Sequence, residues 1–541
     1  MAPREGHAPS EQSQNPDVVV IGGGLAGMCA AVAAAQKGAS VVVLDRAHGG
    51  GTTAISGGVV YAGGGTKQQI EAGYGDDTPD NMFRYLQREV GGAVNEKTLR
   101  RFCDESVARM EWLESCGVQF SGSLCPFRTS YPTSKYFLYF SGNEKAYPFA
   151  EIAKPAPRGH RVVGGGGSGM QMTGKDLWKA LYDSALHLGV QFEGAAKAEE
   201  LLLDQDRKIR GVRYRAMDNR TPMFAKHKSL VERAAWYHTM TINWMAKRLD
   251  GQAEAIWERE AQTKTREARA VILAAGGYVK NESMMEEYTR WAKRVSPLGT
   301  AGDDGSGIHL GQAVGGAVSH MDKISIWRLM YPPEGLVEGI VVSPDGERVV
   351  AEDMYGASSS QILAEKCNGQ GFLILDSKQW AKVKSQVNEQ TEMPWRGFIL
   401  YLIYWAHWKA GSLLDLAGKL GVNPERLEST VTEHNDAIRL GKPDPVHKLN
   451  YRSSIETGPF YGIDISFQPS GPLVAPAMGL GGLRVDGDSG LVLNASGATI
   501  PGLYAAGRNA VGVCSNSYVS GLSLADCVFS GKRAGEHAAS A

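Results

Sequence analysis

The sequence of 541 residues has no long hydrophobic run. Its most apolar stretch, FILYLIYWAHW at residues 398–408, is short and contains His407, whereas a membrane-spanning helix needs about 18 or more consecutive apolar residues. We therefore expect a buried helix in this stretch. The alternative is a face that touches lipid or admits substrate.

The chain also has no excess of charge of either sign. Lysine and arginine total 57 against 58 acidic residues, which gives a net charge of −1, and the basic residues are not clustered. Nucleic-acid-binding proteins carry a basic face, so a nucleic-acid partner is not expected. The absence of a basic face favours small molecules over nucleic acid as partners. The length suffices for two or more domains of a soluble globular protein.

The seven cysteines are an odd number and include no CxxC spacing. This pattern indicates neither a disulfide framework nor a zinc or other metal site. Cysteine usage of this kind indicates a reducing compartment, so we expect a cytoplasmic location. Residues 1–16, MAPREGHAPSEQSQNP, are polar and lack an apolar segment, which predicts a disordered leader rather than a secretion signal.

Glycine, in contrast, is abundant, with 67 residues in short clusters. The first cluster lies in DVVVIGGGLAGMCAAVAAAQKGASVVVLD at 17–45, which predicts a strand, a glycine turn, a helix and a second strand. Gly22, Gly24 and Gly27 form GxGxxG in that turn, and Asp45 ends the second strand. In this context the pattern is typical of dinucleotide binding: the second glycine lets the backbone reach a pyrophosphate, and the acid holds a ribose.

Further glycine-rich turns occur at 49–66, 268–278, 299–317 and 500–513. Because they span the whole chain, the sequence predicts a discontinuous, Rossmann-like α/β cofactor domain formed by residues 17–317 and 468–541. An α+β catalytic or cap domain is inserted at 318–467.

A polar and aromatic run at about 217–264 interrupts this pattern. Trp236, Met240, Trp244 and Leu249 recur at roughly helical spacing, so we expect one or two amphipathic helices. Packing on the domain surface or on another subunit is the simpler interpretation. Peripheral attachment to a membrane is the alternative.

Five motifs carry a family resemblance: GGGTTAISGG, VILAAGGY, GDDGSG, GLGGLRVD, and GLYAAG followed by GLSLADCVFSGKRAG. Together they resemble the FAD-binding fold of fumarate reductase and succinate dehydrogenase flavoproteins and of 3-ketosteroid dehydrogenases. The resemblance implies FAD as the cofactor, attached noncovalently because Gly51 stands in the segment where covalent members carry histidine. Besides Gly22, Gly24, Gly27 and Asp45, the implied FAD-binding residues are Arg46, Thr52, Thr53, Ser56, Gly57, Gly58, Ala275, Gly276, Asp304, Gly507, Arg508, Ser523 and Leu524.

Members of this family differ in their substrates, and the residues at the substrate-binding positions differ accordingly. Fumarate reductases grip two carboxylates with histidines and arginines, whereas the equivalent segments here are ISIWRLMYPP, ERVVAEDMYGAS, AMGLGG and SYVSG. By this alignment the C-terminal arginine falls at Tyr518, and a second arginine falls at Gly356 beside Tyr355. Apolar and phenolic side chains suit a steroid ketone, and YxSGxSL most resembles the 3-ketosteroid Δ4-(5α)-dehydrogenases. Val519 departs from the Δ1-dehydrogenase pattern.

Dehydrogenation beside a ketone needs a base and a donor to the forming enolate. The resemblance implies Tyr518, Ser520 and Tyr355 for these roles, without deciding which residue takes which. A phenol of ordinary pKa is a weak base at neutral pH. We expect the helix near Ser523, with a capping box formed by Ser523 and Asp526, to supply positive potential.

Other side chains are weaker candidates. Five aromatic residues between 130 and 144 are either walls of a steroid cleft or core: Tyr131, Tyr136, Phe137, Tyr139 and Phe140. His160 and His309 are more typical of structural histidines than of ligand contacts, and Glu352 and Asp353 are expected to hold a loop. Three other functions stay open: a Δ1-dehydrogenase, a fumarate- or urocanate-type reductase, and a flavin-bearing scaffold that uses 217–264 for its contacts. The electron acceptor is unknown.

Overall fold

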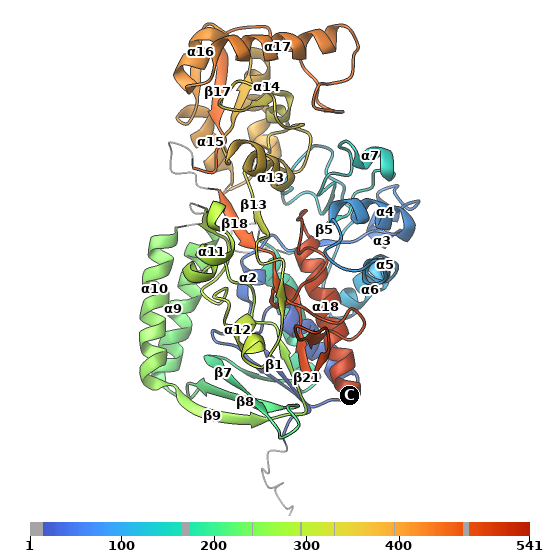
Figure 1. Cartoon of the computed structure of the whole chain (residues 1–541), viewed down its shortest axis with the longest axis vertical. Coiled ribbons are helices and arrows are strands. Elements are labelled where there is room, and N and C mark those ends of the chain that lie inside the picture. The colour runs from blue at the N-terminus through green and yellow to red at the C-terminus, as the bar shows by residue number, and fades with distance from the viewer. Residues whose placement is uncertain are drawn as a thin grey trace, which may run out of the picture.

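The computed structural model describes residues 15–164, 172–240, 242–292, 295–328, 331–393, 395–468 and 475–541. Nearly all of the expected leader, residues 1–14, lies outside these ranges. Figure 1 shows a large lower body that contains the main sheet, and a smaller upper lobe that contains α13 to α17.

The main sheet of the body has six strands in the order β20-β21-β10-β1-β2-β6. All neighbours pair in parallel except β20 and β21. The strands are β1 (Val18–Ile21), β2 (Val41–Leu44), β6 (Gln191–Glu193), β10 (Ala270–Leu273), β20 (Leu491–Leu493) and β21 (Thr499–Ala505). The runs VVVI and VVVL are buried throughout, as parallel strands covered on both faces require.

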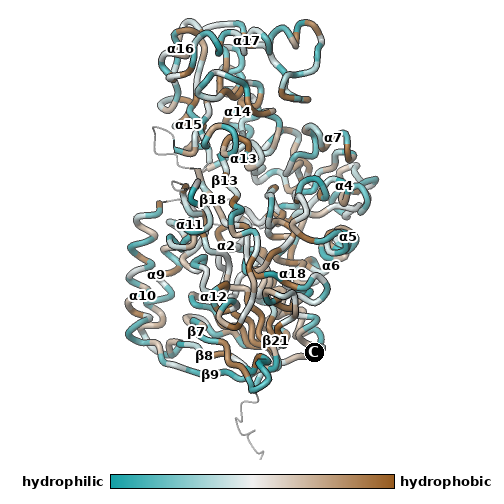
Figure 2. Tube along the Cα trace, viewed as in Figure 1, coloured by the Kyte–Doolittle hydropathy of each residue, from teal (hydrophilic) through white to brown (hydrophobic). Residues whose placement is uncertain are grey.

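One face of this sheet packs against helices α1 (Leu25–Gln36), α8 (Gly174–His187) and α18 (Leu522–Ser540). The other packs against an antiparallel sheet of β7 (Ala196–Leu203), β8 (Ile209–Ala216) and β9 (Gln262–Glu267). In Figure 2 the most hydrophobic segments gather in this layered region near β21. Glycines permit close helix contact, because a Cβ on Gly531 or Gly535 would overlap backbone atoms of α1.

The run between β8 and β9 forms two helices, α9 (Pro222–Thr239) and α10 (Asn243–Glu260), which pack against each other. The expected apolar stripe is wrong in detail. Leu249 is buried, but Trp236 and Trp244 are 47% and 68% exposed. The physical reason is that the chain leaves the helix between residues 239 and 243, so these side chains do not share one helical face.

The described part of the upper lobe contains an antiparallel sheet in the order β14-β15-β17-β16, five α-helices and the short 3-10 helix η2 (Glu334–Glu338). Its strands are β14 (Ile340–Val342), β15 (Phe372–Leu375), β16 (Trp408–Ala410) and β17 (Phe460–Asp464). Its helices are α13 (Gly356–Cys367), α14 (Ser377–Gln390), α15 (Trp395–Tyr404), α16 (Leu413–Leu420) and α17 (Pro424–Arg439).

Helix α15 falls on the apolar stretch that was expected to be a buried helix. Ile403 is its only fully buried residue among those described, whereas Tyr404 and Trp405 are 59% and 73% exposed. The helix therefore lies at the surface of the lobe with only part of its circumference covered. Within the described residues, every helix is too short or too polar to cross a membrane.

Short strands join the two parts of the molecule. β13 (Ile324–Ile326) pairs with β18 (Pro476–Gly479), which also pairs with β11 (Ser296–Pro297), and β12 (Val318–Ser319) pairs with β19 (Gly482–Leu483). The lobe thus leaves and re-enters the body at adjacent strands. This confirms the fold class, a discontinuous Rossmann-like domain with an α+β insertion, while the boundaries 317/318 and 467/468 stay a prediction.

The remaining elements surround the body. A small sheet contains β3 (Val59–Tyr61), β5 (Gly159–Arg161) and β4 (Leu138–Tyr139). The remaining α-helices are α2 (Gly51–Ala54), α3 (Lys67–Glu71), α4 (Pro79–Glu89), α5 (Glu96–Asp104), α6 (Ser106–Ser115), α7 (Phe149–Ile152), α11 (Glu282–Tyr288) and α12 (Ser306–Ala313).

Candidate active site

The turn between β1 and α1 has the geometry that a bound pyrophosphate needs. Gly22 has φ +107°, and a Cβ there would collide with the carbonyl of Ala274. A Cβ on Gly27 would overlap the carbonyl of Gly22, so this glycine allows close packing of helix and strand. A Cβ on Gly24, in contrast, would point into open space at the N-terminus of α1. These are the three glycine roles of a dinucleotide-binding turn.

A cavity of about 1450 Å³, including its open mouth, lies over this turn. Nine of the predicted cofactor-binding residues line it: Gly22, Gly24, Asp45, Arg46, Thr52, Thr53, Ala275, Gly276 and Arg508. Gly51, which stands in place of the family's covalent histidine, also lines it. The residues present therefore fit FAD.

Asp45 organises the ribose end of this cavity. Its carboxylate accepts hydrogen bonds from the backbone N–H groups of Gly23 (2.7 Å), Ala47 (2.9 Å) and Gly49 (2.9 Å). Three backbone donors hold the acid in place at the end of β2. The adjacent Arg46 forms an ion pair with Asp304.

Asp303 is a cavity residue that the sequence reasoning missed. Its carboxylate accepts from Thr52 Oγ1 (2.5 Å) and from the N–H of Gly277 (3.0 Å), and it pairs with Arg508. It thereby ties three predicted cofactor segments together. The signal was present in GDDGSG, but of the two adjacent acids the prediction chose Asp304, which contacts Arg46 and does not line the cavity.

The other predicted cofactor residues do not line this cavity: Gly27, Ser56, Gly57, Gly58, Asp304, Gly507, Ser523 and Leu524. Ser56 bonds the carbonyl of Thr53 (2.8 Å), and the carbonyl of Gly57 accepts from Tyr131 and Thr173 (2.9 Å each). The N–H of Gly507 donates to Ser530 on α18 (2.9 Å). Ser56, Gly57 and Gly507 thus bond to other groups of the protein. Direct contact of these eight residues with the cofactor stays a prediction.

The three predicted catalytic residues are brought together from distant segments. Tyr518 and Ser520 precede α18, and Tyr355 is the N-cap residue of α13. The rings of Tyr518 and Tyr355 have centroids 6.4 Å apart, and Tyr518 also packs on Trp327 at 5.0 Å. Upper lobe and body therefore meet at a cluster of aromatic side chains.

Tyr139 completes this cluster. Its hydroxyl lies 2.7 Å from Ser520 Oγ, and both residues are buried. The sequence reasoning named Tyr139 only as one of five aromatics that either form a wall or belong to the core. Of the others, Tyr136 packs on Phe127 and Phe140 on Tyr74. Tyr139 therefore joins a predicted catalytic side chain directly.

Burial raises the pKa of Tyr518, Tyr355 and Tyr139 above the ordinary value of a phenol. A hydrogen bond with Ser520 acts in the opposite direction on Tyr355 and Tyr139, without cancelling the shift. The three phenols are therefore neutral near pH 7. Neutral phenols suit hydrogen-bond donation to a carbonyl oxygen better than removal of a proton.

The expected capping box on α18 is wrong. The helix begins at Leu522 with Gly521 as its N-cap, at φ 90°, and no side chain caps it. Asp526 instead turns back into the buried core, where it accepts from the N–H of Val513 (3.2 Å). Because Ser523 already lies inside the first turn, it is two positions too late to be the N-cap.

A second, smaller cavity of about 320 Å³ lies beside Tyr518. It is lined from the body by Leu480 and Ser517 and from the upper lobe by Ile326 and Ala357. This volume includes the open mouth of the cavity, so the enclosed space is much smaller. The cavity thus opens next to the tyrosine cluster at the junction of the two parts.

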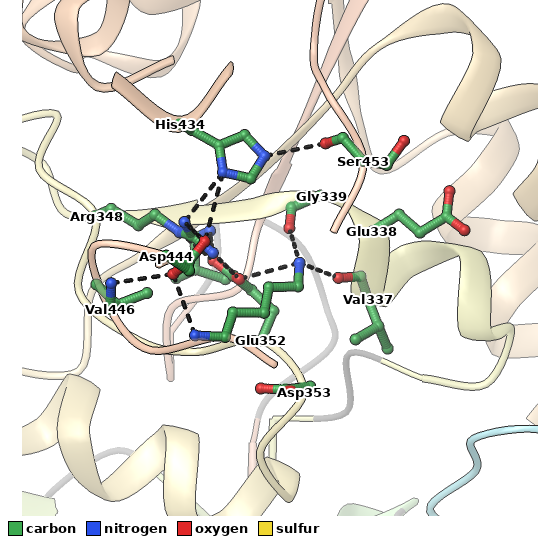
Figure 3. A network of polar contacts seen from close by, with 12 residues as sticks. Val337, Glu338, Gly339, Arg348, Glu352, Asp353, His434, Asp444, Val446 and Ser453 are labelled. Atoms are coloured by element: carbon green, nitrogen blue, oxygen red, sulfur yellow. Dashed lines mark hydrogen bonds and ion pairs between the residues drawn. The ribbon is translucent and has the colours of Figure 1, made fainter. Parts of the chain in front are cut away.

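A buried ionic network fixes the loop that carries Tyr355 (Figure 3). Glu352 pairs with Arg348 (2.6 Å) and Lys448 (3.2 Å), and Arg348 also pairs with Asp444 (2.6 Å). The next residue, Asp353, accepts from the N–H groups of Leu449 (3.0 Å) and Asn450 (2.9 Å). The expectation that Glu352 and Asp353 hold a loop is confirmed.

The two candidate histidines lie away from both cavities. His160 is buried and bonds Thr66 Oγ1 (2.8 Å) and the carbonyl of Arg158 (3.1 Å). His309 is exposed on α12. Arg328, in the segment where fumarate reductases carry a histidine, donates to the carbonyl of Asp464 (2.9 Å) inside the lobe.

Comparison with known proteins gives a consistent result. The FAD binding domain family model matches residues 17–524. The chain is 35% identical over 444 residues to a 3-oxo-5-alpha-steroid 4-dehydrogenase of Comamonas testosteroni. The aligned region covers 79% of this chain and 80% of the relative.

Two solved structures extend the comparison. The 3-ketosteroid-delta4-(5alpha)-dehydrogenase of Rhodococcus jostii RHA1, in complex with 4-androstene-3,17-dione, superposes with a TM-score of 0.82 at 31% identity and covers 100% of both chains. A flavocytochrome c3 fumarate reductase matches with a TM-score of 0.63 at 21% identity over 98% of this chain and 79% of that chain, which shows a shared fold. The chain therefore belongs to the FAD binding domain family, the flavoprotein group in which fumarate reductases and 3-ketosteroid dehydrogenases share one fold, and it is an FAD-dependent oxidoreductase.

Proposed function

We propose that the protein dehydrogenates a 3-keto-5α-steroid by introducing the C4–C5 double bond. The observation that carries this proposal is the cluster of Tyr518, Tyr355, Tyr139 and Ser520, where carboxylate-reducing members of the fold would need cations. The similarity to two 4-dehydrogenases of 3-ketosteroids supports the same substrate class.

In this proposal FAD, when bound, supplies the acceptor for the hydride that leaves C5. Tyr518, a neutral phenol, donates a hydrogen bond to the C3 carbonyl oxygen and stabilises the enolate that forms when C4 loses its proton. Ser520 relays that proton. As its hydroxyl takes the proton up, it gives its own to Tyr139 or Tyr355 through their hydrogen bonds, and that phenol in turn releases a proton to solvent water. Trp327 holds the Tyr518 ring and gives the steroid an apolar surface.

The alternatives have less support. A fumarate- or urocanate-type reductase requires cations at the substrate. Arg328, which lies in the segment that matches a histidine segment of those reductases, instead donates to the carbonyl of Asp464 within the lobe. A Δ1-dehydrogenase would act on the same substrates, but Val519 departs from its pattern and the two most similar proteins above are 4-dehydrogenases. A scaffold would not need the buried hydroxyl cluster.

The test is anaerobic mixing of the holoenzyme with a 3-keto-5α-steroid, followed by the loss of oxidised flavin absorbance. We expect bleaching within the turnover time and a product whose double bond, located by NMR, lies between C4 and C5. A C1–C2 double bond would favour the Δ1 alternative. No bleaching by steroid, with reoxidation of reduced enzyme by fumarate or urocanate, would replace the proposal by the reductase.

A further inference from the structure

The α9–α10 hairpin, residues 222–260, has an inner side that the sequence reasoning did not anticipate. Seven of its residues line the FAD cavity: His227, Val231, Ala235 and His238 from α9, and Asp250, Ala253 and Glu254 from α10. Figure 1 shows the two helices standing alongside the body, next to α11 and α12. The hairpin is therefore a wall of the cofactor site as well as a surface element.

Ion pairs fasten this wall to the body. Glu254 on α10 contacts Arg46 (3.5 Å) and Lys197 (3.4 Å). Arg46 also pairs with Asp304, so one arginine links the hairpin, the end of β2 and the loop before α12. Arg46, Lys197 and Glu254 all line this cavity, and the side chains of Arg46 and Lys197 are 25% and 29% exposed.

A second contact lies close to the first. His227 Nδ1 is 2.9 Å from His48 Nε2, and Phe224 packs edge-on against the His48 ring with centroids 4.9 Å apart. Burial lowers the pKa of His48 to about 3, so the two imidazoles pair in neutral form near pH 7. Elsewhere in the cavity wall, His238 Nε2 is 2.8 Å from the Asp250 carboxylate.

The place of these contacts identifies which half of FAD they face. In a dinucleotide-binding fold the pyrophosphate lies at the glycine turn, and the acid at the end of the second strand holds the adenosine ribose. Glu254 contacts Arg46, the residue directly after that acid, and Lys197 in β7, which lines the cavity from the same end. The hairpin thus faces the adenosine half.

We propose that the α9–α10 hairpin is a cover for the adenosine half of FAD, and that the ion pairs of Glu254 with Arg46 and Lys197 hold it closed. Release of FAD then requires these pairs to open. This role depends on FAD binding and is independent of the steroid that the enzyme oxidises. It gives the inner side of residues 222–260 a function that neither oligomer nor membrane contact explains.

The first test compares Glu254→Gln and Glu254→Lys with matched controls at Glu258, which lies one turn further along α10 and pairs with Arg215 (2.8 Å) outside the cavity. FAD dissociation is followed by the rise in flavin fluorescence after dilution of the holoprotein. Partly exposed ion pairs are weak, so Glu254→Gln should release FAD about two- to fivefold faster. Glu254→Lys, which places three cations together, should release it faster still, and both Glu258 variants should behave as the parent.

The second test uses FMN, which lacks the adenosine half. The apoproteins of Glu254→Gln and Glu254→Lys are reconstituted with FAD or with FMN. Relative to the parent, both variants should bind FAD more weakly and FMN equally well. A further variant replaces residues 217–261 by Asn-Gly, because Ala216 and Gln262 are directly paired strand residues that a two-residue turn can join. It should lose about tenfold or more in FAD affinity and retain its affinity for FMN.

The point variants keep the proposal testable if the shortened chain does not fold. Equal losses for FAD and FMN would mean that the hairpin supports the whole fold rather than the adenosine half. FAD release from both Glu254 variants at the parent rate would overturn the proposal. Neither result would bear on the steroid test, which measures oxidation by fully loaded enzyme.

Discussion

Tyr518 is the residue on which the proposed chemistry depends most. Tyr518→Phe keeps the ring and its contact with Trp327 but removes the hydroxyl. Losing one oxyanion donor typically slows a reaction by about 10²–10³-fold, so reduction of the flavin by a 3-keto-5α-steroid should slow by that factor. Stopped-flow absorbance under anaerobic conditions measures it, with flavin content and thermal stability unchanged.

Tyr136→Phe is the control for this experiment, since Tyr136 is an aromatic of the same region that packs on Phe127. It should reduce its flavin at the parent rate. Tyr139→Phe and Ser520→Ala should each slow reduction, because they break the 2.7 Å contact between the two hydroxyls. A Tyr518→Phe enzyme within about threefold of the parent, well short of the loss of a donor, would assign this tyrosine a packing role.

Asp526 predicts a pH dependence of stability. Burial raises the pKa of its carboxyl from 3.8 to about 6, so the ionised form is disfavoured in the folded state. The contribution of the protonated carboxyl to the free energy of unfolding is therefore fully present below pH 3.8, and it is lost as the pH rises through about 6. The loss amounts to about 3 kcal/mol at pH 7.5 and about half of that at pH 5.

Asp526→Asn removes this titration. Relative to the parent, the variant should gain about 1–1.5 kcal/mol in free energy of unfolding between pH 5 and pH 7.5. Parallel thermal unfolding of both holoproteins at the two pH values checks the sign. If the difference in free energy of unfolding between variant and parent is the same at both pH values, Asp526 is ionised in the folded state without loss of stability.

At the scale of elements, the β1–α1–β2 unit shows what a sequence can predict. Its glycine spacing, its apolar strands and Asp45 follow from local rules, and the structure contains all of them. The role of α9 and α10 did not follow, because it depends on Glu254 meeting Arg46 across 208 positions of sequence. Tyr139 was ranked low for the same reason, since its partner Ser520 is 381 positions away.

The loop that carries Tyr355 depends on Lys448. This side chain is fully buried, pairs with Glu352 and donates to the carbonyls of Val337 (2.6 Å) and Gly339 (3.0 Å). Lys448→Met should destabilise the upper lobe by about 3 kcal/mol, because it leaves two carbonyls and part of a buried carboxylate without a partner. Amide hydrogen exchange should increase in β14 and in residues 343–356.

The matched control is Lys442→Met, an exposed position in the same connection. It should leave exchange unchanged. Because the network also orients Tyr355, flavin reduction by steroid should slow in Lys448→Met but not in Lys442→Met. Parent-like exchange in Lys448→Met would show that the lobe is held by its apolar core instead.

At the scale of the whole molecule, the cofactor should be held without a covalent bond. Gly51 lines the cavity in the segment where covalent members carry a histidine, and it offers no nucleophile. Acid precipitation of the holoprotein should therefore leave all flavin in the supernatant. Fluorescence that stays with the precipitated polypeptide would contradict this.

The chain order of the main sheet has a consequence for synthesis on the ribosome. β1 lies in the first 21 residues, yet its neighbour β10 pairs in turn with β21, which ends at Ala505. The body therefore cannot complete its sheet until the chain has emerged as far as Ala505. The upper lobe, whose four strands lie between residues 340 and 464, can form earlier as a cotranslational unit. The nascent chain thus carries a folded lobe while its body is still unfinished, and synthesis of β21 and Arg508 sets the earliest time at which the FAD cavity is complete.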